Sequence, residues 1–319
     1  MTRAEQWSLE YRRDRYLAMF SNEMVVQRAR DILCNLLTVT NELKVGILGG
    51  GNDDRDGKLS YWMELWTHAL EEMMSLRHYP SALYKKETNK EKELIVPNAN
   101  WPGIEKAVDV FRSLSYSGKP CIIRYGEKDR LQRMFDRGEM RINPASSYDD
   151  PSLNYAVKDN ELEMKMYVRS PLFEKIPAMF AKGMQGELTV FRVLEEMLQA
   201  PSNYYAYCMS MAPNIRLFGD FKATACIIAT DPERFVEKIV NGCTDILNGW
   251  VCRKGRVRYV DPIRSGTDGI DVLTCKHFRF TYQDEYRLAW VPATGTVDVL
   301  EPFDIELGDL HDCCELLIL

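Results

Sequence analysis

Apolar residues in the first third of the chain follow the spacing of amphipathic helices. Between residues 5 and 45 no proline interrupts a helical pattern of apolar positions, namely Leu17, Phe20, Met24, Ile32, Leu33, Leu36 and Leu37. Two further helices are predicted over residues 59–76, ending before Pro80, and over residues 101–117. We therefore expect a helical N-terminal domain over residues 1–117.

From residue 118 onward the pattern changes to short apolar runs between amphipathic helices. One helix is closed by Gly138, and another begins with Asp231 as N-cap and Pro232 in the first turn and stops at Gly242. Strands are predicted within the stretches KPCIIRYGE, EMRINP, NYYAYCMSM, FKATACIIAT, GRVRYVDP, HFRFTYQDEYRLAWVP and GTVDVLEPFDIEL. Such interspersed elements predict a mixed α+β domain over residues 118–319.

Residues 277–290, HFRFTYQDEYRLAW, carry the most regular alternation in the chain. Aromatic and aliphatic residues occupy one parity, and polar residues occupy the other. Side chains on a strand alternate between its faces, so this pattern predicts one strand with a packed face and a polar face. Gln283, Glu285 and Arg287 would share the polar face, which is either a solvated surface or the floor of a site.

Composition and charge narrow the function classes. The chain has 319 residues, 45% of them hydrophobic and 28% charged, with a formal net charge of -6. No basic run stands out, which argues against general binding to nucleic acid but leaves room for a local basic pocket. The N-terminus lacks an apolar signal core, and no apolar run approaches the ~18 residues of a membrane span. We expect a cytoplasmic protein without a membrane partner.

Neither the cysteines nor the histidines have the spacing of a metal site. The nine cysteines contain no CxxC pair, and the four histidines form no HExxH motif. We expect no metal, cysteines that act as core residues, and a packed rather than ligating His68. The segment GILGGGNDDRDGK satisfies neither GxGxxG nor GxxxxGK[ST] and is interpreted as a connector between helices.

Two polar segments are candidates for a site. Arg124 ends an apolar strand on the parity of Ile122, so it needs a partner, either a carboxylate such as Glu127, Glu163 or Glu285, or a phosphate. The segment NPASSYDDP, around Tyr148, is rich in turn-forming residues, and it also gathers hydroxyl and carboxylate groups beside an aromatic ring.

Taken in order, these segments resemble a known family. The chain has IRYG on a first strand, a helix ending in Gly138, the loop YDDP, CMS on a middle strand and DEYR on a late strand. This order, over about residues 119–292, resembles a widespread prokaryotic family labelled only as a domain of unknown function. That layout in turn resembles the ADP-ribosyltransferase superfamily, in which residues of a first, a middle and a late strand surround NAD.

The resemblance assigns roles by motif position. Arg124 would be the first-strand residue that holds the pyrophosphate or the nicotinamide-side phosphate of NAD, and Ser210 would be the nucleotide-binding residue of the middle strand, although Met-Ser-Met replaces the usual Ser-Thr-Ser. Gln283 and Glu285 would be the catalytic Q-x-E pair. Cleavage of the nicotinamide–ribose bond builds positive charge on the ribose, which a carboxylate at Glu285 would stabilise while Gln283 orients the acceptor. Tyr148 or Tyr125 would stack on the nicotinamide ring.

The resemblance leaves three hypotheses. The first is an NAD-dependent ADP-ribosyltransferase that modifies a protein or nucleic acid, as a bacterial toxin or phage-defence effector with a regulatory or antitoxin partner. The second is an NAD glycohydrolase, in which water is the acceptor. The third is a non-catalytic nucleotide- or partner-binding module in which Arg124 and Glu285 form a structural ion pair.

Overall fold

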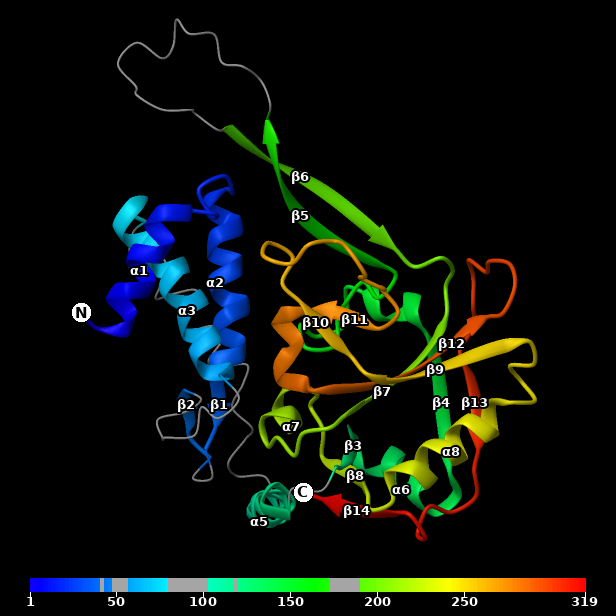
Figure 1. Cartoon of the computed structure of the whole chain (residues 1–319). Coiled ribbons are helices and arrows are strands. Elements are labelled where there is room, and N and C mark those ends of the chain that lie inside the picture. The colour runs from blue at the N-terminus through cyan, green and yellow to red at the C-terminus, as the bar shows by residue number, and fades with distance from the viewer. Residues whose placement is uncertain (41–42, 48–56, 80–102, 118–119, 173–189) are drawn as a thin grey trace, which may run out of the picture.

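The chain is a mixed α+β protein. The computed structural model describes residues 1–40, 43–47, 57–79, 103–117, 120–172 and 190–319. Within these ranges, helices from the N-terminal part of the chain pack beside a large antiparallel sheet that carries helices on both faces (Figure 1). Of the glycine-rich connector, residues 48–56 lie outside the described ranges.

The N-terminal helices pack around a shared apolar cluster that includes Leu17, Ile32 and Leu65. The elements are α1 (Arg3–Asp14), α2 (Asn22–Leu36), α3 (Lys58–Leu70), which continues as the π-helix η1 (Glu71–Leu76), and the small hairpin of β1 (Leu37–Val39) and β2 (Val45–Ile47). The continuous helical pattern predicted over residues 5–45 is thus broken in two places. Ser21 starts a new helix, because its side chain caps the backbone N–H of Met24. The β-branched residues after Leu36 then favour the hairpin.

Eight strands of the described residues form one sheet. They are β3 (Ile122–Gly126), β4 (Glu139–Pro144), β7 (Tyr205–Ser210), β8 (Ala225–Ala229), β9 (Trp250–Arg256), β12 (Glu285–Pro292), β13 (Phe303–Glu306) and β14 (Cys314–Ile318). Along the main path the order is β13-β4-β7-β3-β8-β14, while β12 joins β7 to β9. Every pairing in this sheet is antiparallel.

Helices cover both faces of the sheet, as the unbroken apolar runs in its strands require. On one face α6 (Lys128–Arg137) and α8 (Pro232–Cys243) pack over Ile122 and Ile227. On the other face α5 (Ile104–Ser117) and α7 (Arg216–Asp220) pack over the intervening residues, among them Ile123 and Ile228. By its packing, therefore, α5 belongs with the sheet, whereas the domain boundary between residues 117 and 118 stays a prediction.

The sheet splits along one edge of β7. On one side, β12 pairs with the whole of β7, from Glu285 opposite Ser210 to Trp290 opposite Tyr205. On the other side, β3 pairs only at Ser210 and β4 only at Ala206 and Tyr205. The edge of β7 between these pairings is left open, and β3 and β4 diverge from it.

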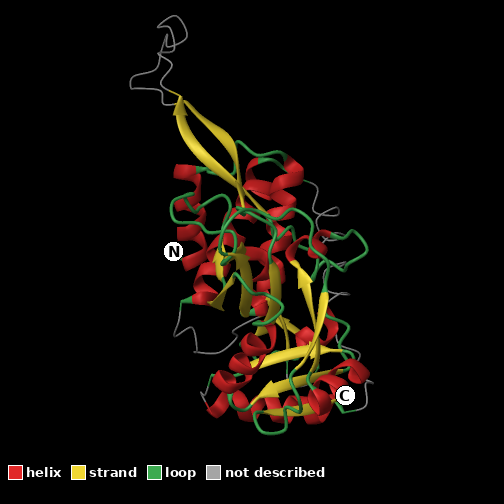
Figure 2. Cartoon of the chain, turned by 90° about the vertical axis from the view of Figure 1, so that its right-hand side faces the viewer, coloured by secondary structure: helices red, strands yellow, loops and turns green. Residues whose placement is uncertain are grey.

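Three smaller units complete the described chain. The strands β5 (Glu163–Leu172) and β6 (Val190–Gln199) form a long hairpin that projects from the body (Figure 2). The strands β10 (Arg258–Val260) and β11 (Cys275–His277) pair in parallel beside the main sheet, and the 3-10 helix η2 (Ala145–Asp149) follows β4. Neither the hairpin nor β14 is predicted by the sequence pattern.

Several local predictions in the second part of the chain are confirmed. Asp231 caps α8 by accepting from the N–H of Arg234, and Pro232 occupies the first turn. Gly138 ends α6 with φ +69°, and an added Cβ there would lie 2.3 Å from the carbonyl oxygen of Gly308. Glycine is required at this position both for its left-handed conformation and for the close approach of the two backbones.

The single strand predicted over residues 277–290 is wrong. β11 ends at His277, a 3-10 helix η4 (Phe278–Gln283) follows, Asp284 adopts φ +44°, and β12 begins at Glu285. Tertiary contacts override the alternation, since Phe278 is buried among the N-terminal helices and Asn35 of α2 bonds to the backbone of η4. Gln283 and Glu285 therefore do not share one strand face.

Candidate functional site

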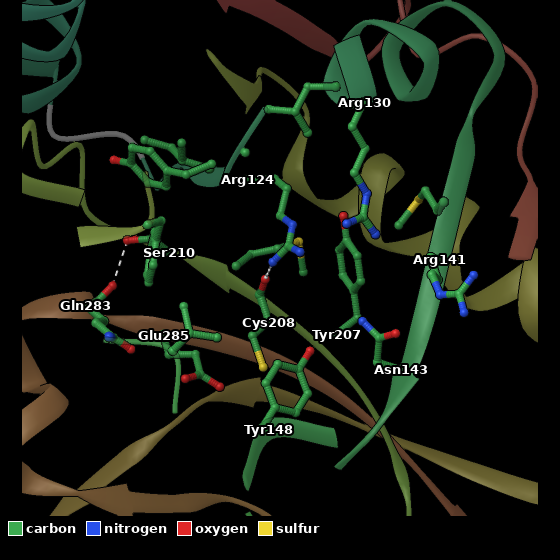
Figure 3. Close-up of a pocket in the computed structure, with 18 of the residues that line it drawn as sticks. Arg124, Arg130, Arg141, Asn143, Tyr148, Tyr207, Cys208, Ser210, Gln283 and Glu285 are labelled. Atoms are coloured by element: carbon green, nitrogen blue, oxygen red, sulfur yellow. Dashed lines mark hydrogen bonds between the residues drawn. The ribbon is translucent and has the colours of Figure 1, made fainter. Parts of the chain in front are cut away.

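A pocket of about 420 Å³ opens where β3 and β4 diverge from β7 (Figure 3). It is lined by residues from β3, α6, β4, η2, β7, η4 and β12, segments that lie far apart in the sequence. All six site residues named from the sequence line this pocket, namely Arg124, Tyr125, Tyr148, Ser210, Gln283 and Glu285. The pocket lies where strand pairing in the sheet is interrupted, and this interruption leaves room for side chains.

Arg124 extends from β3 to the open edge of β7. Its Nη1 donates to the carbonyl oxygen of Cys208 at 2.6 Å, and its guanidinium lies 4.8 Å from the centre of the Tyr207 ring. The side chain thereby satisfies a carbonyl that β3 and β4 leave unpaired. None of the three carboxylates considered as partners from the sequence forms an ion pair with Arg124 within the described ranges. The Arg124–Glu285 ion pair considered under the third hypothesis is therefore not formed, and the other donors of the Arg124 guanidinium are free to serve the pocket that it lines.

Glu285 lies in a buried network of charges at the other side of the pocket. Its Oε1 accepts from Arg287 Nε at 2.7 Å, and its Oε2 accepts from Lys276 Nζ at 2.9 Å. Glu161 bridges the same two cations, at 2.7 Å from Arg287 Nη2 and 3.1 Å from Lys276 Nζ. Burial by itself would raise the pKa of Glu285, but the charges of Arg287 and Lys276 outweigh it and hold that pKa well below its usual value.

The polar residues beside Glu285 are buried rather than solvated. Gln283 and Glu285 are 4% and 3% exposed, so the interpretation of this segment as a solvated face is wrong. The side chain of Gln283 donates from Nε2 to the carbonyl oxygen of Ala156 at 2.7 Å. The backbone carbonyl of Gln283 accepts from Ser210 Oγ at 2.7 Å. Ser210 therefore ties the end of β7 to η4, which is a structural use of the hydroxyl assigned to nucleotide binding.

The two tyrosines proposed to stack on a ligand differ in their surroundings. The Tyr125 ring is packed against Phe218 in the core on the α7 side of the sheet, with ring centres 5.1 Å apart, and its hydroxyl accepts from the N–H of Asn214 at 3.1 Å. Tyr148 sits on η2, is half-buried, and presents its ring to the pocket next to Cys208 (Figure 3). Tyr148, not Tyr125, is placed to stack on a planar ligand.

Sequence reasoning missed several lining residues, chiefly Arg130, Arg141, Asn143, Glu161 and Lys276. Figure 3 shows Arg124, Arg130 and Arg141 on one side of the pocket and Gln283 and Glu285 on the other. Arg130 has no ion pair or hydrogen bond within the part of the chain that the structure describes. The only sequence signal for Arg130 and Arg141 is their closeness to Arg124 along the chain, whereas no pattern connects Glu161 to Glu285.

Asp159 borders the charge network and provides a pH-dependent test of it. Its carboxylate lies 3.9 Å from Lys276 Nζ, and burial, followed by the negative charge of Glu161, raises its pKa from 3.8 to about 6. Between these values the folded protein keeps a proton that the unfolded chain has lost, so this group makes stability fall as the pH rises. We expect Asp159→Asn to be more stable than the wild type above about pH 6 and to lose that advantage toward about pH 4.

Urea unfolding of both proteins at a series of pH values measures this effect. Asp268→Asn, at an exposed carboxylate, is the matched control. A stability difference between Asp159→Asn and the wild type that does not change across the window would contradict the assignment.

Two of the histidines, His68 and His277, are packed against aromatic rings. His68 is buried against Tyr11 and Tyr16, as expected of a packed residue. Burial and then the charge of Arg279 lower the pKa of His277 to about 3, so this ring stays neutral.

Among the described residues no group of three or more His, Cys, Asp or Glu side chains is placed to hold a metal ion. No helix in the described ranges combines the length and apolarity needed to cross a membrane.

Comparisons with known proteins did not identify a family for this chain. A scan against protein-family models, a search of curated proteins and a search of solved structures each found no match to this chain.

Proposed function

We propose that the chain is an NAD-dependent ADP-ribosyltransferase that modifies a protein or nucleic-acid acceptor. The observation that carries the proposal is that Arg124, Gln283 and Glu285, chosen by their motif positions, line one pocket together with Tyr148. A shared pocket is the minimum that the chemistry demands, because phosphate binding, ring stacking and stabilisation of a sugar cation must act on one molecule.

The charges around the pocket match the charges of NAD. Arg124 and Arg130 offer donors on one side, where a pyrophosphate would be held through charge-assisted hydrogen bonds. Tyr148 offers an aromatic face for the nicotinamide or the adenine. Glu285 on the opposite side is ionised at neutral pH, because Arg287 and Lys276 lower its pKa.

In the proposed reaction, bond breaking between nicotinamide and ribose develops positive charge on the sugar. A carboxylate has about four lone-pair positions, and Arg287 and Lys276 use one on each oxygen. With one of the remaining lone-pair positions, Glu285 would accept a hydrogen bond from a ribose hydroxyl. This bond increases the electron density on the ribose and so stabilises the cationic carbon in the transition state. Nicotinamide would leave as a neutral molecule, and the acceptor, placed beside Gln283, would bond to the cationic carbon and release its proton to solvent.

A second candidate, a non-catalytic nucleotide-binding module, is favoured by one observation. Both oxygens of Glu285 are already bonded to buried cations, which reduces the negative charge available to a sugar cation. In this case Arg124 and Arg130 would still bind phosphate, and Glu285 would be a structural member of the charge network.

Incubation of the purified protein with cell lysate and NAD labelled in its adenylate phosphate distinguishes the candidates. A labelled macromolecule together with free nicotinamide supports the transferase. Free nicotinamide without a labelled macromolecule indicates a glycohydrolase, and binding without nicotinamide release indicates the module. Absence of binding and of turnover rejects NAD as the ligand.

Arg130 gives the cleanest test of the phosphate side, because it makes no hydrogen bond or ion pair to another described residue. We expect Arg130→Gln to weaken NAD binding about tenfold or more, since a hydrogen bond to a charged group contributes about 1.5–3 kcal/mol. Isothermal titration calorimetry measures the change. Arg133→Gln is the matched control on the same helix, as Arg133 pairs with Glu139 and does not line the pocket. Equal losses in both variants would argue against a specific phosphate contact.

A further inference from the structure

The 3-10 helix η4 is hydrogen-bonded to α2 through a buried side chain, Asn35. Asn35 is 2% exposed, and its Nδ2 lies 3.1 Å from the carbonyl oxygens of both Phe278 and Arg279. Its Oδ1 accepts from the N–H of Tyr282 at 3.0 Å. A single amide thus bonds to both ends of the short helix, and it does so from a part of the chain more than two hundred residues away.

These bonds fix the backbone that leads directly into the pocket. Tyr282 is followed by Gln283, which lines the pocket, then by Asp284 with φ +44°, and then by Glu285. A left-handed conformation at a residue other than glycine costs about 1–2 kcal/mol and persists only where the flanking structure imposes it. On the η4 side Asn35 bonds to the backbone of Tyr282, two residues before Asp284. Asp284 itself accepts at its carbonyl from the N–H of Met211 at 2.7 Å and at its carboxylate from Arg256 Nε at 2.7 Å.

A second buried side chain joins the same two elements. Arg216 of α7 donates to the carbonyl oxygens of Cys34 and Leu37 at the C-terminal end of α2, and its guanidinium lies 3.6 Å from the centre of the Tyr282 ring. It is fully buried and paired with Asp220 at 2.7 Å. The end of α2 and the end of η4 are therefore parts of one rigid polar cluster behind the pocket wall.

We propose that Asn35 is a positioning residue for the pocket, through which the N-terminal helices set the placement of Gln283 and Glu285. Asn35 acts through the backbone of η4 and is not itself among the residues that line the pocket. Loss of its bonds frees η4 to change its path, and the pocket wall moves with it. The effect on ligand binding rests on the proposed function, because NAD is the ligand used to detect it, whereas the effect on η4 does not.

The experiment compares Asn35→Ala and Asn35→Asp with Glu72→Gln. Glu72 belongs to the same helical part of the chain and is fully buried, but its hydrogen-bond partners are Tyr11, Arg15 and Arg77, which form no hydrogen bond with η4 within the described residues. Asn35→Asp keeps the size of the side chain and the acceptor for Tyr282, but it places a carboxylate against the carbonyl oxygens of Phe278 and Arg279 and is therefore the stronger disruption. Where Asn35→Asp does not fold, Asn35→Ala carries the test.

Two quantities are measured in each variant, hydrogen exchange over residues 278–285 and the dissociation constant for NAD, with the melting temperature recorded alongside. The Asn35 variants are expected to speed exchange over this segment and to raise the dissociation constant about tenfold, whereas Glu72→Gln lowers the melting temperature and leaves both quantities near wild type. Unchanged exchange in the Asn35 variants, or changes in all variants that simply follow the loss in melting temperature, would overturn the proposal.

The two proposals fail in different ways. If the wild type does not bind NAD, the proposed function is rejected, and hydrogen exchange alone decides the role of Asn35. If the wild type binds NAD and the Asn35 variants bind equally well with faster exchange, Asn35 holds η4 but does not position the pocket, and the inference is rejected.

Discussion

Glu285→Gln is expected to lower the free energy of unfolding by about 3–5 kcal/mol and to reduce NAD cleavage by about a hundredfold or more. The stability loss arises because Lys276 and Arg287, both buried, are left with Glu161 as their shared close carboxylate. The loss of cleavage arises because a neutral amide stabilises a sugar cation less than a carboxylate does. Urea unfolding and nicotinamide release measure the two effects separately.

A second substitution separates catalysis from structure. Combining Glu285→Gln with Lys276→Met leaves Arg287 and Glu161 as a balanced pair at 2.7 Å, so most of the lost stability is expected to return. NAD cleavage is not expected to return. Recovery of cleavage along with stability would show that Glu285 serves only the charge network, and a Glu285→Gln variant as stable as wild type would contradict the network itself.

Arg28→Met is expected to lower the free energy of unfolding by about 3–5 kcal/mol, because it leaves the buried carboxylate of Asp261 without its cation. Arg28 of α2 binds both oxygens of Asp261, at 2.8 and 2.6 Å, and the two side chains are 2% and 4% exposed. Burial raises the pKa of Asp261, but Arg28 more than compensates and keeps it below its usual value. Chemical unfolding monitored by tryptophan fluorescence measures the loss.

The matched control for this pair is the double substitution Arg28→Met with Asp261→Asn. It removes both charges, and replacement of a whole buried pair is often close to neutral, so most of the stability is expected to return. Because Arg28 lies in the N-terminal helices and Asp261 follows β10, the result also measures how firmly the helices are docked on the rest of the chain. A double variant as unstable as Arg28→Met would mean that Arg28 acts through packing on Phe278 and Tyr16 instead.

Elements whose signals are local were predicted well. Asp231 and Pro232 start α8, Gly138 closes α6, and the apolar run that ends in Arg124 is β3. In each case the responsible interaction lies within a few residues, so it can be inferred from neighbours along the chain. The strands β5, β6 and β14 lack such signals and were not predicted.

The site was predicted in part. The residues that could be predicted interact with near neighbours along the chain, whereas the missed residues come from distant segments. Arg287 beside Glu285 could be inferred, because residues two apart on β12 share a face, and their side chains do meet at 2.7 Å. Lys276 and Glu161 could not, since they reach Glu285 from other elements. The segment containing Gln283 was misassigned as strand, because Phe278 is buried among the N-terminal helices and Asn35 of α2 bonds to the backbone of the segment.

Patterns along the chain were enough to predict α6, α8 and β3 and to choose the polar residues worth testing, since caps, turns and strand faces depend on near neighbours. Folding was needed to show that β7 is left open between β3 and β4, that Glu285 is held by two buried cations, and that Asn35 of α2 bonds to η4. The physical reason is that each of these features satisfies a buried charge or an unpaired backbone group with a partner from a distant segment, and such partners become neighbours only on folding.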